Sequence, residues 1–246
     1  MAKQTGLRSN IYVDGYNISG DFQAISRMNG GPAPIVTTGI DKEAVERLGG
    51  QRDGNLDAVT FFNPDTDQSH LVLSPLPLAD RVLSMFHLQS GETFSLVAKQ
   101  GNYDPTRAAD GSLTVAVNSM ANSYGAEWGH ALTDGPVTHT EADEEASLDG
   151  LAASAFGAQA WLHVFDFTGT DCTIAIQSSS DNGVGDAWAD IAALTFTEVT
   201  AAPFAERIQT ARNAAVERYL RVATTGTFDS ITFAVSVTRN QTVVNF

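Results

Sequence analysis

Apolar and aromatic side chains recur at every second position through much of the later half of this sequence, and this period constrains the fold most strongly. One run contains Trp161, His163, Phe165 and Phe167, and another contains Ile231, Phe233, Val235 and Val237. A strand points successive side chains to opposite faces, whereas a helix repeats about every 3.6 residues. The sequence therefore predicts a mainly β protein.

The same period occurs in shorter stretches of the first half. We expect strands over residues 10–14, 18–26, 56–62, 93–100, 112–119, 160–167, 172–177, 216–222 and 231–238. Turn sequences such as Thr168-Gly169-Thr170 and Thr225-Gly226-Thr227 separate the later strands. Short strands with such turns predict a β-sandwich of about 100 residues in the later half.

Two short helices are expected to interrupt the first half. In the segment 41–49, Asp41 can cap the free amides, Glu43 and Arg47 are spaced i, i+4, and Gly49 can end the helix. The second segment, 76–87, places four apolar residues on one stripe: Leu76, Ala79, Leu83 and Phe86. Both helices are expected to be short and to lie beside a sheet.

A polar segment separates the two halves. Residues 133–157 are rich in Gly, Thr, Ala and acids and show no strand period, so they are predicted to form a linker or a long loop. We place the domain boundary near residue 145, with one domain over 1–145 and a second over 146–246.

Acidic residues dominate the charge of the chain. The 29 acidic and 14 basic side chains give a formal net charge of −15, and residues 108–206 contain 15 acids without Lys or Arg. Such a surface disfavours binding to nucleic acid phosphates and to anionic membranes. The segment is interpreted as a solvated acidic face, or as a surface that repels polyanions and neighbouring particles.

Residues for catalysis or for a cofactor are few. The five histidines stand outside any zinc-binding spacing, the single cysteine Cys172 has no partner for a disulfide, and nucleophile-elbow and phosphate-loop motifs are absent. His163 is interpreted as a packed or hydrogen-bonded residue. We therefore expect a protein that is not an enzyme and that uses no cofactor or resident metal.

Two further patterns are interpreted conservatively. The loop Asp181–Asp186 gathers oxygen ligands around glycines but lacks the alternating acids of an EF-hand, so a surface turn is favoured over a calcium site. The first ten residues contain no apolar segment, so synthesis in a cytoplasm without membrane insertion is expected.

Several stretches carry a resemblance to a known family. In the first half they are residues 10–21, 39–50, 52–56, 61–64, 99–104 and 110–113, and in the later half they are 159–162, 218–222 and 233–240. The first half resembles the major tail tube protein of bacteriophages with long, non-contractile tails. The later half resembles the β-sandwich that is appended to some of these proteins.

The resemblance implies a fold and a function. It implies a tail-tube-type β-sandwich or barrel with two short helices, followed by a second β-sandwich that decorates the outside. Subunits of the family form rings, usually hexameric, which stack into a tube, and a long loop and the N-terminal segment reach the neighbouring ring. DNA passes through the lumen without specific binding. The implied location is the virion tail, and the implied partners are the chain itself, the tape measure, the tail terminator and the distal tail protein.

The resemblance also directs attention to residues for contacts between subunits or rings. They are Arg27, Gly30, Gly31, Asp41, Glu43, Arg47, Gly49, Gly50, Arg52, Asp53 and Arg81. The arginines are expected to pair with the acids across interfaces, because arginine forms bidentate contacts and is enriched there. The glycine pairs are expected to let the loops remodel on assembly, and the lumen wall is expected to be acidic or neutral.

Two alternatives belong to other classes of protein. A carbohydrate- or receptor-binding module would stack a sugar on an exposed aromatic, for which Trp188 in its glycine-rich loop is the candidate, while Trp161 alternates into a core face. A capsid decoration protein would share the acidic sandwich without the tube function.

Overall fold

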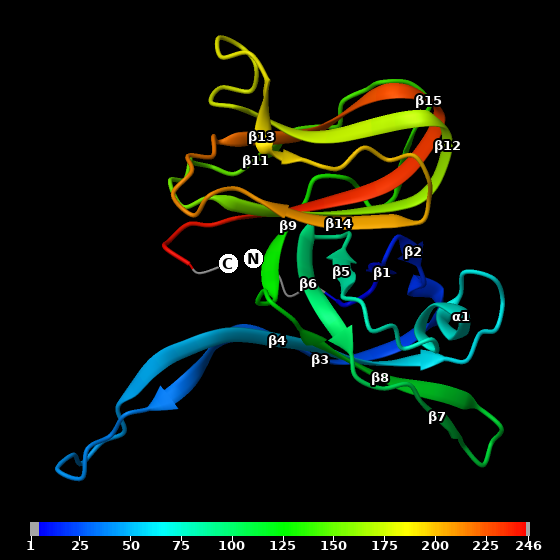
Figure 1. Cartoon of the computed structure of the whole chain (residues 1–246), viewed down its shortest axis with the longest axis vertical. Coiled ribbons are helices and arrows are strands. Elements are labelled where there is room, and N and C mark those ends of the chain that lie inside the picture. Colours follow the sequence, from blue (N-terminus) through cyan, green and yellow to red (C-terminus); the bar gives the residue numbers. More distant parts are fainter. Residues whose placement is uncertain (1–4, 245–246) are drawn as a thin grey trace.

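The computed structural model describes residues 5–244 and is built almost entirely from antiparallel strands, which confirms the predicted mainly β class (Figure 1). The first half contributes β1 (Ser9–Val13), β2 (Tyr16–Asn17), β3 (Phe22–Val36), β4 (Arg47–Phe61), β5 (Arg81–His87), β6 (Glu92–Gln100), β7 (Asp104–Arg107), β8 (Leu113–Ala121) and β9 (Glu127–Ala131). The later half contributes β10 (Val137–His139), β11 (Leu148–Asp149), β12 (Ala158–Ser179), β13 (Ala189–Thr195), β14 (Phe204–Gln209) and β15 (Tyr219–Arg239).

The first half packs two groups of strands around one hydrophobic cluster. Strands β1, β5 and β6 pair side by side and face β4 and β8, which pair with each other in antiparallel register. The cluster includes Ile11, Leu56, Phe94 and Val115, all essentially buried. Alternation along β4 and β8 explains this, because Leu56, Ala58, Val115 and Val117 point inward while their neighbours point to the outer face.

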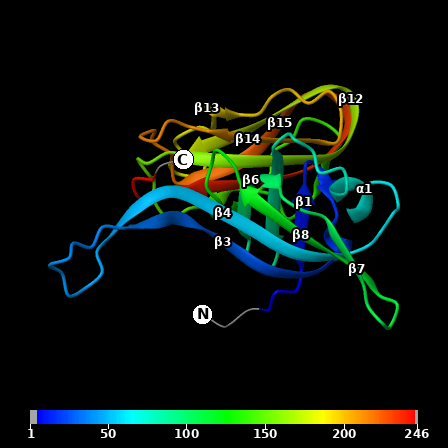
Figure 2. The ribbon, with the colours of Figure 1, turned by 60° about the horizontal axis from the view of Figure 1, so that its bottom comes forward.

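A long hairpin formed by β3 and β4 extends well beyond this cluster. The ladder runs from Phe22↔Thr60 to Val36↔Arg47, with residues 37–46 as the connection. Figure 1 shows its far end projecting at the lower left, and Figure 2 shows the projection from a second direction. The far end of the hairpin therefore projects away from the packed body of the molecule.

Two long strands build the later half. β12 and β15 pair over almost their whole length, and both curve from one layer of the sandwich to the other (Figure 1). The expected turns at residues 168–170 and 225–227 are instead bends within these strands. Register shifts at Thr168/Gly169 and Gly169/Asp171 and the positive φ of Gly169 and Gly226 produce the bend. The four expected short strands are thus two long bent ones.

The second hydrophobic cluster fills this sandwich. One face of β12 contributes Ala160, Leu162 and Val164, and β15 contributes Phe233 and Val235. The opposite face of β12 carries Trp161, His163 and Phe165, which point toward the first half. Trp161 is 1% exposed, so its predicted burial is confirmed.

A third, smaller cluster joins the halves. It consists of Tyr12 and Phe86 from the first half and Ala234 from β15, with Phe165 packed against them. Strand β9 pairs with β6 on one side and with β15 on the other, so hydrogen bonding also continues between the halves.

The expected linker over 133–157 is an ordered strap along β15. β10 pairs with β15 at Val137 and Phe233, and β11 pairs with β15 at Leu148 and Leu220. Between these two strands, the N–H of Glu145 donates to the Val222 carbonyl. Polar composition hid this role because the strap needs only a few buried side chains. The domain boundary near residue 145 stays a prediction, and the strap packs on the second cluster from Leu132 onward.

Both predicted helices are wrong. Residues 41–49 form the connection of the long hairpin and the start of β4, because a short helical pattern without a packing partner is marginal in water. Residues 81–87 are β5, which is buried on both faces: Leu83 enters the first cluster and Phe86 the third. A doubly buried strand has no clean alternation, which imitated a helical stripe. The α-helix of the described residues is α1 (Ser69–Leu73).

Candidate interaction surface

The far end of the long hairpin exposes a group of aliphatic side chains. They are all more than half exposed: Ile35, Val36, Ile40, Val45 and Leu48. Contiguous exposed apolar surface on a soluble protein marks an interaction site more often than isolated apolar residues do. We call this group the hairpin tip.

Close packing holds the base of the hairpin at a fixed angle. A side chain at Gly30 or Gly54 would collide with Ala126, which lies on the loop before β9. These glycines are therefore required for the approach of two backbones, and Gly30 does not serve the loop remodelling that we expected of it. Gly31 has a positive φ and open space around its α-carbon.

The structure places most of the predicted contact residues on this one element. The residues of the β3–β4 hairpin are Arg27, Gly30, Gly31, Asp41, Glu43, Arg47, Gly49, Gly50, Arg52 and Asp53. Arg27, Asp41, Glu43 and Arg47 have exposed side chains. Their participation in contacts between subunits remains a prediction.

Arg81 corrects that prediction, because it lies in the interior. Its Nε donates to Asp14 Oδ2 at 2.7 Å, and its Nη1 donates to the Val72 carbonyl and to Gln100 Oε1. The residue is 4% exposed. A guanidinium so enclosed stabilises the subunit itself and is not available to a neighbour.

Arg52 is also engaged within the chain. Its two terminal nitrogens donate to the carboxylate of Glu127 at 2.5 and 2.9 Å, and Glu127 is buried. The expected pairing of Arg52 with Asp41, Glu43 or Asp53 of a neighbour is replaced by this bidentate ion pair between β4 and β9. Burial raises the pKa of Glu127, and Arg52 opposes this effect.

An apolar groove lies beside the base of the hairpin, a feature that the sequence analysis did not find. Its volume is about 530 Å³, and its apolar lining comes from Ile11, Phe22, Ile25, Met28, Met85 and Trp128. Trp128 is 53% exposed and packs edge-on against Phe94. The one available signal was the spacing of Phe22, Ile25 and Met28, which a bulged strand turns to the same face.

The outer face of the sheet β3–β4–β8–β7 is mixed in character, because polar side chains share it with Phe61 and Met120, which are 43% and 48% exposed. Arg27 stands opposite Asp57, and Asp57 in turn accepts amide hydrogen bonds from Asn55 and Asn118. Ala116 and Thr114 continue the same face. It offers neither a strongly basic patch nor a deep recess.

Comparisons with known proteins give fold-level similarity alone. No protein-family model and no curated protein matches the sequence. Among solved structures, the chain is similar to a protein of the tail of an empty gene transfer agent particle of C6 symmetry, at 12% identity and a TM-score of 0.41. That similarity covers 50% of this chain and 97% of the other.

Two further solved structures are similar at 12% identity. One is from the virion of a native gene transfer agent, with a TM-score of 0.39 over 50% of this chain and 97% of that one. The other is the SPP1 Dit protein, described as a hub of the adsorption apparatus of phages that infect Gram-positive bacteria. Its TM-score is 0.33, over 94% of this chain and 99% of that chain.

Trp188 is a poorer stacking platform than its loop position indicated. It is half-buried, and the guanidinium of Arg221 lies over its ring at 4.6 Å from the centroid. One ring face is therefore already used by a cation–π contact. Sugar stacking on Trp188 remains an untested prediction.

The Asp181–Asp186 loop is a hydrogen-bonded turn. The carboxylate of Asp181 accepts the N–H groups of Val184, Gly185 and Asp186 at 2.7–3.2 Å, and these bonds lower its pKa. Over residues 5–244, no group of three or more His, Cys, Asp or Glu side chains is placed to hold a metal ion. The same residues contain no helix that is long and apolar enough to span a membrane.

The buried histidines serve packing. His163 Nδ1 accepts the N–H of Gly15 at 3.4 Å, and its Nε2 contacts Ser84 Oγ at 3.0 Å, which fulfils the interpretation made from the sequence. Desolvation lowers the pKa of His163 to about 3.

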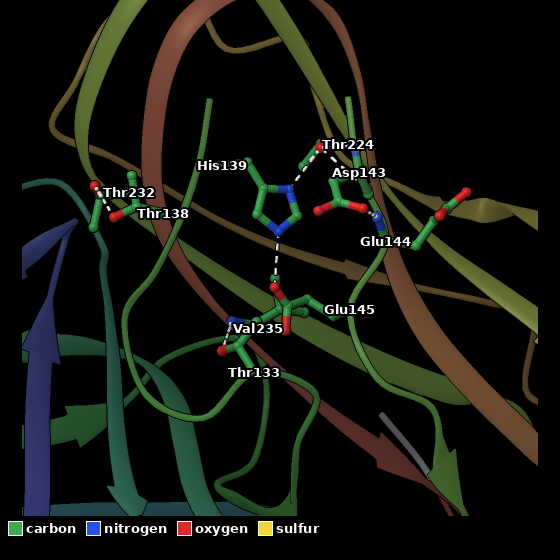
Figure 3. A network of polar contacts seen from close by, with 9 residues as sticks. All are labelled: Thr133, Thr138, His139, Asp143, Glu144, Glu145, Thr224, Thr232 and Val235. Carbon is green, nitrogen blue, oxygen red and sulfur yellow. Dashed lines mark hydrogen bonds and ion pairs between the residues drawn. The ribbon is translucent and has the colours of Figure 1, made fainter. Parts of the chain in front are cut away.

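His139 fastens the strap to β15 (Figure 3). Its Nε2 donates to Glu145 at 2.7 Å, and its Nδ1 contacts Thr224 Oγ1 at 2.8 Å. The order of hydroxyl, imidazole and carboxylate imitates a catalytic triad, but Thr224 is 2% exposed and its Oγ1 accepts the N–H of Asp143. A hydroxyl so enclosed cannot attack a substrate, so the network is structural.

Proposed function

We propose that this protein is a non-enzymatic structural subunit of a phage tail tube. It assembles into rings, hexameric by resemblance to the tail tube family, and the rings stack around a lumen through which DNA passes. One observation carries the proposal: the same chain exposes both an aliphatic hairpin tip and, elsewhere on its surface, an apolar groove.

A tip on one copy and a groove on the next make a head-to-tail contact. Such a heterologous contact joins different surfaces, and it closes into a ring when the rotation between copies divides a full turn. The hairpin projects far from the cluster that contains the groove, so a copy cannot satisfy its own groove with its own tip (Figure 1). Both surfaces leave water when copies associate, which supplies the driving force.

The lumen is assigned to the outer face of the β3–β4–β8–β7 sheet. On this face Asp57 accepts amide hydrogen bonds from Asn55 and Asn118, and Arg27 of β3 stands opposite Asp57. A wall on which acidic and amide groups accompany the few cations does not retain DNA phosphates strongly during transit. The acidic later half then faces outward, where it repels polyanions and other particles.

The location and partners follow from the same proposal. The subunit belongs to the virion tail after synthesis in the host cytoplasm. Its first partner is itself, and the ends of the tube meet the tape measure, tail terminator and distal tail proteins.

Electron microscopy of the purified, concentrated protein tests this function. Wild type should form rings and stacked tubes, and Val45→Asp at the hairpin tip should abolish them, because a carboxylate in an apolar contact is costly to desolvate. Val184→Asp is the matched control, since Val184 is 88% exposed but lies on the distant loop after β12, and it should assemble normally.

Three results would overturn the proposal. They are a wild type that stays monomeric at high concentration, equal assembly of both valine variants, and rings that never stack.

A further inference from the structure

A cluster of unpartnered polar atoms lies between the two halves. Within residues 5–244, seven buried side-chain nitrogen or oxygen atoms have no hydrogen-bond partner, and five of them belong to Gln159, Trp161 and Arg207. Trp161 stands opposite Arg207 in the β12–β14 ladder, and Gln159 lies two residues along the same face of β12. Native proteins leave few such atoms unpaired, so a concentration of them calls for a missing partner such as water, an ion or a ligand group.

The unpaired atoms are mostly donors. They comprise Nε and Nη2 of Arg207, Nε1 of Trp161 and both amide atoms of Gln159, of which the carbonyl oxygen alone accepts. Nε and Nη2 form the edge of a guanidinium that meets a carboxylate in two parallel hydrogen bonds. The remaining nitrogen, Nη1, donates to Gln209 Oε1 at 2.8 Å.

The charge of Arg207 points to the same ligand. No carboxylate of the described residues forms an ion pair with it, and the nearby Glu127 is held by Arg52. Burial lowers the pKa of Arg207 to about 10. An anion placed against this edge would offset the desolvation of the guanidinium.

A pocket at the base of the hairpin adjoins this region through Tyr124. It has a volume of about 710 Å³, and its lining includes Arg52, Ser123, Tyr124, Gly125 and Arg212. The Tyr124 ring lies 3.7 Å from the Arg207 guanidinium and separates it from the pocket. Tyr124 is 36% exposed, and a rotation of its side chain into solvent would uncover Arg207.

We propose that Arg207 binds a carboxylate that enters through this pocket as Tyr124 turns aside, and that a second copy of this chain supplies it. The source rests on the self-assembly proposed above. Each copy carries 29 acidic side chains against 14 basic ones, and the pocket adjoins the hairpin that reaches a neighbour. The net charge of −15 opposes a nucleic acid as the source.

The intrinsic fluorescence of Trp161 tests the site directly. The full-length double variant Trp128→Phe/Trp188→Phe keeps Trp161 as the one tryptophan of the three. Sodium acetate should change its emission with saturation, whereas sodium chloride at equal ionic strength should not. In that background Arg207→Lys keeps the positive charge but cannot form the bidentate hydrogen bonds of a guanidinium. Half-saturation should therefore need about tenfold more acetate.

Matched variants keep the result falsifiable. Arg218→Lys, at a surface arginine paired with Asp149, should leave the titration unchanged, and Tyr124→Ala should lower the acetate needed. If Arg207→Lys does not fold, the Tyr124→Ala shift alone decides. A titration that does not saturate, that is equal in Arg207→Lys, or that is tighter for phosphate than for acetate overturns the carboxylate site.

The source of the carboxylate is tested separately. Saturating acetate should slow ring assembly of wild type and leave assembly of Arg207→Lys unchanged. Rings that form at the same rate with and without acetate overturn the second copy as the source. Absence of rings without acetate defeats the tube function instead, while the fluorescence titration still reports on the pocket.

Discussion

At the scale of single residues, arginines of identical appearance in the sequence occupy different environments. Arg27 is exposed on the hairpin, whereas Arg81 is enclosed by Asp14, Val72 and Gln100. The sequence could identify the arginines as notable but could not sort them, because burial of a long side chain depends on strands that are distant in the chain. The sequence analysis did not single out Arg207, because the absence of hydrogen-bond partners for its buried Nε and Nη2 is visible only in the structure.

His163 provides a prediction about pH. Its pKa is about 3 in the folded protein, compared with 6.5 for an unperturbed histidine. Below pH 6.5 the unfolded chain therefore binds a proton at this residue that the native state does not bind. Burial of the neutral imidazole therefore costs no stability through protonation above pH 6.5. The free energy of unfolding decreases as the pH falls from 6.5 to about 3. The loss approaches about 1.4 kcal/mol per pH unit.

The variant His163→Gln removes this titration. At pH 7.5 we expect it to be less stable by about 1–3 kcal/mol, since it disturbs a buried hydrogen-bonded site, and the gap should narrow at pH 5. Urea denaturation at both pH values measures the gap. His130→Gln, at an exposed histidine, is the control and should follow wild type. A gap for His163→Gln that stays constant or widens on acidification contradicts the assignment.

At the scale of elements, most of the long strands were predictable, whereas β5 and the hairpin connection were not. Residues 56–62, 93–100 and 112–119 were expected as strands and lie in β4, β6 and β8. β5 lost its alternation because both faces are buried, and the hairpin connection imitated a helix because Asp41, Glu43 and Arg47 happen to fit helical spacing. The groove combines residues from β1, β3, β5 and β9, which no local pattern can bring together.

Proteolysis distinguishes the hairpin from the strap. In the strap, Glu145 and Asp143 form backbone hydrogen bonds to Val222 and Thr224 of β15. The connection 37–46 projects into solvent and is held mainly at its ends, where Thr37 donates to Glu46. A glutamyl protease should therefore cut first after Glu43 or Glu46 and later after Glu141 or Glu144. Mass spectrometry of early fragments checks the order, and first cleavage within the strap would show it to be the weaker segment.

At the scale of the whole molecule, the halves share one interface, and the hairpin tip and the apolar groove both lie on the first half. Tyr12, Phe86 and Ala234 bury the contact between the halves, and β9 continues the hydrogen bonding. The groove lies beside the base of the hairpin, and the hairpin tip lies at its far end. The proposed head-to-tail contact between copies requires this separation of the two surfaces on one chain.

Cysteine cross-linking between copies tests the head-to-tail contact most directly. The native thiol, Cys172, is buried, which raises its pKa to about 12 and keeps it unreactive. Ile40→Cys places a thiol at the hairpin tip, and Gln23→Cys places one at the exposed rim of the groove. Under mild oxidation, a mixture of the two single variants should give a mixed disulfide-linked dimer, while each variant alone should stay monomeric in denaturing electrophoresis. A disulfide between two Ile40→Cys tips, or no mixed dimer at concentrations where rings form, would contradict the tip-in-groove contact.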